Sequence, residues 1–205
     1  MINETKVGIQ VNSDGAQIVA RSDRTGASVV TDAHGPLYEA ALRGNLFMAH
    51  AIVTAPVIYT TAAGTGGPLI WNGSTNRNVS ILAIGWGVTT VTTVAAALGI
   101  TGNTGQTSAP TSTTAIDSSR NLFLGGSASA ATAYRVGTVT NAGNFLIPLG
   151  DLHTGALTTE PGSFHWILTG GFPVVPPNTW VSLAASATAT TTVIQAGIIW
   201  EETVA

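Results

Sequence analysis

From residue 46 to the C-terminus, short segments rich in β-branched and aromatic residues alternate with turn signals. Such segments are typical of β-strands, and a long series of them follows here. The expected strands are residues 46–53, 56–61, 68–71, 78–88, 89–100, 122–124, 133–139, 144–149, 164–168, 180–187 and 191–200, of which the shortest are the least distinct. Alanines in 89–100 would suit a helix, but its threonines and valines favour a strand.

The number and spacing of these strands predict an all-β fold, an antiparallel jelly-roll-like β-sandwich. About 160 residues fit a jelly roll better than an immunoglobulin domain, which has about 100 residues. The Gly-, Thr- and Ser-rich residues 101–119 are expected to form a long loop.

Charged residues are concentrated at the N-terminus. The chain has seven Lys and Arg and ten Asp and Glu, and between Gly44 and Ile116 the only charged residue is Arg77. Residues 1–45 carry more than half of the charges and few large apolar side chains, so we expect an extended arm before a body at 46–205. Within the arm we expect a hairpin at Asp14-Gly15 and a short helix between Pro36 and Gly44.

A soluble domain usually has about 25% charged residues, whereas this chain has 8%. A surface so poor in charge is solvated weakly and is usually covered by another chain. The composition therefore predicts a subunit of a larger assembly, and three-fold closure of an apolar sandwich makes a homotrimer the expected form.

Composition also argues against several classes of protein. A net charge of −3 with a single lysine does not favour nucleic-acid binding. Without cysteine there is no disulfide or thiolate metal site. The N-terminus does not resemble a secretory signal, and no apolar stretch is long enough to insert into a membrane. We expect synthesis in the cytoplasm.

Candidate catalytic and metal-binding groups are sparse. Asp32 and His34 could belong to an acid/base pair, but turn chemistry explains them better. His153, His165, Asp151 and Glu160 could gather a divalent cation, although nothing in their spacing fixes a geometry.

Enzyme motifs give no support for catalysis. No Gly-x-Ser-x-Gly elbow occurs, and the neighbours Glu201 and Glu202 would point to opposite faces of a strand. We expect no enzyme activity, no cofactor and no bound metal.

The five tryptophans could fill the core, form an interface or present a platform for a sugar ligand. Core and interface positions are the more common. Trp71, Trp86 and Trp166 are the candidates for a ligand platform or an interface.

Two terminal segments carry a family resemblance. Residues 29–47 (VVTDAHGPLYEAALRGNLF) resemble the N-terminal segment of small virion-associated proteins of tailed bacteriophages, and residues 198–202 (IIWEE) are similar to the C-terminal ending of that group. The candidate attachment residues in this region are Asp32, His34, Tyr38 and Arg43.

The resemblance implies a structural role in the virion. The first expectation is a capsid decoration, or cement, protein that binds the major capsid protein or another virion protein. The alternative is a receptor-binding module of a head fibre or tail spike that holds a host glycan.

Overall fold

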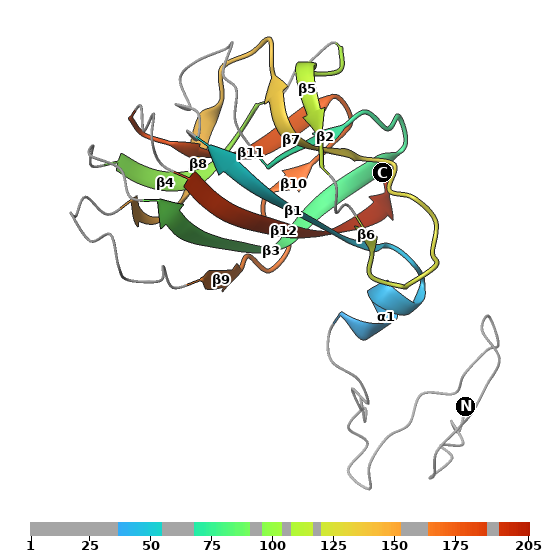
Figure 1. The fold of residues 1–205 in the computed structure, drawn as a ribbon. Helices are drawn as coiled ribbons and strands as arrows, with labels where there is room; N and C mark the ends of the chain where they lie inside the picture. The colour runs from blue at the N-terminus through green and yellow to red at the C-terminus, as the bar shows by residue number, and fades with distance from the viewer. Residues whose placement is uncertain are drawn as a thin grey trace, which may run out of the picture. The chain divides into compact units, whose positions relative to one another are not determined.

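The computed structural model describes residues 37–54, 68–90, 96–103, 108–116, 120–152, 164–187 and 193–205 of the chain. They form two antiparallel β-sheets and one short helix (Figure 1). The predicted all-β class and the two-sheet sandwich are confirmed. The elements, in chain order, are α1 (Tyr38–Leu42), β1 (Leu46–Thr54), β2 (Leu69–Asn72), β3 (Arg77–Thr90), β4 (Ala96–Asn103), β5 (Thr111–Ala115), β6 (Arg120–Asn121), β7 (Thr132–Thr138), β8 (Asn144–Leu152), β9 (His165–Leu168), β10 (Val174–Val175), β11 (Thr179–Ala185) and β12 (Val193–Val204).

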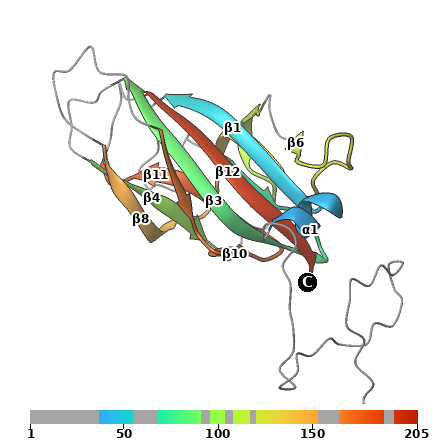
Figure 2. The same ribbon diagram turned by 90° about the horizontal axis from the view of Figure 1, so that it is seen from below.

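Sheet I is built around β12, which pairs with β3 on one side and with β1 on the other. Its strand order is β10-β3-β12-β1-β6, and β9 pairs with β3 beside β10. Figure 2 shows β1, β12 and β3 running side by side. The two short strands β9 and β10 therefore form one edge of this sheet.

Sheet II has the strand order β5-β7-β2-β11-β4-β8. Strands that are consecutive in the chain often lie in different sheets: β1 and β3 belong to sheet I, whereas β2 and β4 belong to sheet II. The same alternation returns at the end of the chain, where β10 and β12 lie in sheet I and β11 in sheet II.

The main hydrophobic core fills the space between the sheets. On β12 the inward side chains Ile194, Ala196, Ile198 and Trp200 are buried, as the two-residue period of a strand requires. Trp200 stacks on Phe47 of β1 with ring centroids 5.9 Å apart. Each fully buried large side chain contributes about 1.5–3 kcal/mol to folding.

A second, smaller cluster buries the central strand of sheet II on its other side. Trp180 packs there with Leu69 and Val139, and Trp71 and Tyr134 lie against them. Every residue of β11 is buried as a result.

Several details of the predicted strands and loops are wrong. Residues 101–119 are not one loop, because β4 continues to Asn103 and Thr111–Ala115 forms β5 against β7. Residues 122–124 are not a strand: the side-chain oxygen of Asn121 accepts a hydrogen bond from the Phe123 N–H, an Asx turn that ends β6. Residues 89–100 are not one strand, because β3 ends at Thr90 and β4 begins at Ala96, with 91–95 outside the described residues. The short strand β10 was not predicted.

By its internal contacts the chain divides into Met1–Tyr38 and Glu39–Ala205. All but the last two residues of the first unit lie outside the described residues, as do the expected hairpin at Asp14-Gly15 and the expected strand 56–61. The boundary at residue 45 and the attachment role of the arm remain predictions. Within the described residues, no helix has the length and apolar character needed to cross a membrane.

Candidate functional site

The helix α1 ends where the sequence predicts. Gly44 lies just past it with a φ of 71°, a left-handed conformation that glycine adopts without strain. Its N–H donates to the carbonyl of Ala41, and the N–H of Asn45 donates to the carbonyl of Ala40. These two hydrogen bonds form a Schellman motif, which satisfies the last carbonyls of the helix. The motif places Arg43, an exposed residue, immediately before the turn into β1.

Two hydrogen bonds attach this helix end to the β-sandwich. The Glu202 N–H donates to the carbonyl of Asn45 at 2.9 Å, and the side-chain amide of Asn121 donates to the carbonyl of Gly44 at 2.8 Å. Asn121 also donates to the carbonyl of Ser127, so that the same side chain holds the segment after β6. The position of α1 relative to that segment is therefore fixed by named contacts.

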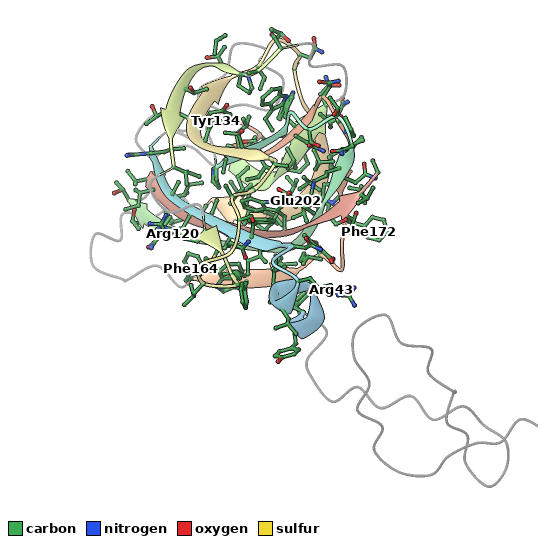
Figure 3. All side chains as sticks on the ribbon, turned by 90° about the vertical axis from the view of Figure 1, so that its right-hand side faces the viewer. Arg43, Arg120, Tyr134, Phe164, Phe172 and Glu202 are labelled. Atoms are coloured by element: carbon green, nitrogen blue, oxygen red, sulfur yellow. The ribbon has the colours of Figure 1, made fainter. Side chains whose placement is uncertain are left out.

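A pocket of about 430 Å³ lies between α1 and the segment that follows β6. Its lining combines apolar and charged side chains: Leu42, Arg43, Phe47, Arg77, Phe123 and Glu202, with small residues between them. Figure 3 shows Arg43 just after the end of α1, and Glu202 within the sandwich. Two of its apolar members are exposed, Leu42 at 51% and Phe123 at 46%. Leu124, the next residue after Phe123, does not line the pocket but is 87% exposed. We call Leu42, Arg43, Phe123 and Leu124 the α1 surface.

Glu202, at the bottom of this pocket, is only 1% exposed. One carboxylate oxygen accepts hydrogen bonds from the Ser129 hydroxyl and from the N–H of Ala131, and the other accepts from the N–H of Ala130. Arg77 lies 3.8 Å away. A buried carboxylate needs such partners, because leaving it without them would be very costly. Through these hydrogen bonds the Glu202 carboxylate holds residues 129–131 against the end of β12.

Two of the expected attachment residues are described and two are not. Tyr38 is exposed on the first residue of α1, and Arg43 is part of the α1 surface. Asp32 and His34 lie outside the described residues.

The three candidate tryptophans occupy different environments. Trp86 is buried in the main core, and its ring lies 5.7 Å from the ring of His165. Trp71 is half-buried against the second cluster, where its indole N–H has no hydrogen-bond partner among the described residues. Trp166 is 45% exposed.

Trp166 lies on an exposed strand. All four residues of β9 are exposed, and so is Phe164 just before it. Sequence reasoning did not anticipate this exposure, because an apolar run such as 164–168 usually marks a buried strand. The available signal was the set of glycines on β3 and β12, which leave room for large rings over those strands.

Of the four residues weighed as metal ligands, His153 and Glu160 lie outside the described residues. Asp151 belongs to β8, where it pairs with Ala97, and His165 belongs to β9 beside Trp86. No group of three His, Cys, Asp or Glu side chains with the geometry of a metal site occurs among the described residues.

Comparison with known proteins gives no relative. No protein-family model, no curated protein and no solved structure matches the chain.

Proposed function

We propose that this chain is a structural protein of a tailed-phage virion, a capsid decoration protein that binds the head and stabilises its shell. Binding would bury apolar surface across the boundaries between capsid subunits, and many copies per particle would add avidity. The resemblance of residues 29–47 and 198–202 to virion-associated proteins supports this class of function.

The observation that carries the proposal is the α1 surface. It exposes two large apolar side chains, Leu42 and Leu124, at the point where the charge-rich N-terminal segment joins a body with few charges. Exposed apolar groups of this size, next to a charged residue such as Arg43, are typical of protein interfaces, where an apolar centre is surrounded by a polar rim. The proposed partner is the major capsid protein or a neighbouring virion protein.

We also infer that the sandwich is a jelly roll. A jelly roll contains eight strands in two four-stranded sheets, connected as two Greek keys. The order β10-β3-β12-β1 in sheet I and the order β2-β11-β4-β8 in sheet II support this topology, with the remaining strands as additions at the edges. Jelly rolls are frequent in viral capsids, although the fold alone does not define the function.

Co-sedimentation with empty heads of the phage that encodes the chain tests the proposed function. We expect the full chain to sediment with the heads and the double variant Phe123→Ser/Leu124→Ser to bind much more weakly. The matched control is Phe172→Ser, because Phe172 is 67% exposed but belongs to the connection between β9 and β10. Equal binding by the double variant and the full chain would show that the α1 surface is not the attachment surface.

A further inference from the structure

The outer face of sheet I carries a row of residues that crosses four strands. Trp166 of β9 pairs with Gly85 of β3, Gly85 pairs with Gly197 of β12, and Gly197 pairs with His50 of β1. The adjacent residues Ile84 and Ile198 point into the core. Because side chains alternate along a strand, the row lies on the face turned away from the core.

The indole of Trp166 extends across this row. A Cβ atom added at Gly85 would lie 2.7 Å from ring atoms Cδ2 and Cε2 of Trp166, and one added at Gly197 would lie 3.3 Å from Cη2. The ring therefore covers the backbone of two neighbouring strands; a Cβ atom at Gly85 would clash with it, and one at Gly197 would be in tight contact with it. Although the ring lies on these glycines, 45% of Trp166 remains exposed to solvent.

A second ring and a polar pair complete the surroundings. Phe164 lies beside Trp166, with centroids 5.6 Å apart and ring planes at 56°. At the other end of the row, the side-chain amide of Gln195 donates a hydrogen bond to Nε2 of His50 at 2.8 Å. We call this arrangement of Trp166, Phe164, His50 and Gln195 the Trp166 platform.

On β1, β12, β3 and β9, the three adjacent rows of this face contain no Asp, Glu, Lys or Arg; beyond β1, the row of Met48 continues to the exposed Arg120 of β6. The members of the rows on these four strands are Met48, His50 and Ile52 on β1, Gln195, Gly197 and Ile199 on β12, Ala83, Gly85 and Gly87 on β3, and Trp166 and Leu168 on β9. Because Arg120 lies on the far side of β1 from Trp166, a ligand that binds on the ring itself is expected to be uncharged.

We propose that the Trp166 platform binds neutral hexopyranose units of a glycan. A pyranose ring has an apolar face of C–H groups, which packs on an open aromatic face, while its hydroxyls bond to neighbouring planar polar groups. Sites for small ligands commonly combine an apolar wall with a few polar side chains, as Trp166 does with His50 and Gln195. The geometry favours a neutral sugar over an acidic ligand at the ring, because the residues around Trp166 are uncharged and Arg120 lies beyond β1 at the end of its row.

This site is separate from the surface assigned to virion attachment. The α1 surface lies on α1 and on the segment after β6, whereas the platform lies on β9, β3, β12 and β1. The chain could bind a protein shell through one surface and a glycan through the other. Loss of sugar binding and loss of head binding are therefore distinguishable outcomes.

Affinity electrophoresis of the full chain tests the platform. The native gels contain, in turn, galactomannan, glucomannan, dextran or hydroxyethylcellulose as neutral polysaccharides, and alginate as an anionic one. We expect at least one neutral polysaccharide to slow the protein and alginate to leave its mobility unchanged. The substitution Trp166→Ala should lower the affinity for that polysaccharide about tenfold or more, because the ring supplies the main contact area.

Two further variants separate the platform from a general effect on folding. Gly85→Ala keeps Trp166 but introduces a methyl group at the position that both rings now occupy, so it should also weaken retardation. Phe172→Ala removes an exposed aromatic ring outside the rows and should behave like the original chain. Circular dichroism establishes that each variant is folded.

Three results would overturn the proposal. The first is an unchanged mobility of the original chain in all four neutral polysaccharides. The second is undiminished retardation of the folded Trp166→Ala variant. The third is a Trp166→Ala variant that is still retarded but has a lower oligomer mass in light scattering than the original chain. That result would make the face a contact between copies of this chain.

Discussion

Glu202 is a charged residue on the inward side of an otherwise apolar strand. Side chains alternate between the two faces of a strand, so Glu202 lies on the same face as the buried Trp200, two residues before it. The sequence therefore contains the signal that this carboxylate is buried. Its partners could not be predicted, because Ser129, Ala130 and Ala131 are more than seventy residues away in the chain.

The substitution Glu202→Gln should lower the free energy of unfolding by about 1–3 kcal/mol, which is the usual cost of leaving buried hydrogen-bonding groups without partners. The new amide would turn N–H donors toward groups that are themselves donors. Urea denaturation followed by tryptophan fluorescence measures the change.

The matched control for this prediction is Glu201→Gln. Glu201 is the half-buried neighbour of Glu202, and the control should change stability by no more than ~0.5 kcal/mol. Equal losses in the two variants would show that the contacts of Glu202 do not fasten residues 129–131.

At the scale of elements, long segments with a clear apolar pattern were predictable. The strands β1, β11 and β12 begin and end within a few residues of the expected ranges, because their side chains fill the core. The strand β5 was not predictable, since its threonines and serines look like a loop and its structure depends on pairing with β7. The exposure of β9 follows from its place at a sheet edge, which local sequence does not encode.

The helix α1 belongs to the part of the chain that we expect to mediate attachment. A truncated chain beginning at Asn45 loses Leu42, Arg43 and the hydrogen bond between Asn121 and Gly44, but keeps the whole main core. Its free energy of unfolding should fall by only about 1–2 kcal/mol, since one such hydrogen bond contributes about 1 kcal/mol. Its binding to empty heads should be much weaker.

Urea denaturation and head co-sedimentation of the truncated chain measure these two effects separately. Aggregation on expression would show that residues before Asn45 belong to the core of the body. Undiminished binding to heads would place the attachment surface in the sandwich itself.

At the scale of the whole molecule, the low charge of the chain predicts association with other copies. With 8% charged residues and 44% hydrophobic residues, the surface of a single chain is poorly solvated. We expect a homotrimer, with a mass of about three times 20.8 kDa in multi-angle light scattering. A monodisperse monomer at micromolar concentration would contradict this expectation.

The central claim is that the chain is a decoration protein of a phage head. Electron cryomicroscopy of the intact virion of the phage that encodes it tests this claim most directly. We expect β-sandwich density repeated over the outer surface of the head, in contact with the capsid protein through the α1 surface. Density confined to the tail or to a single vertex, or none in the virion, would contradict it.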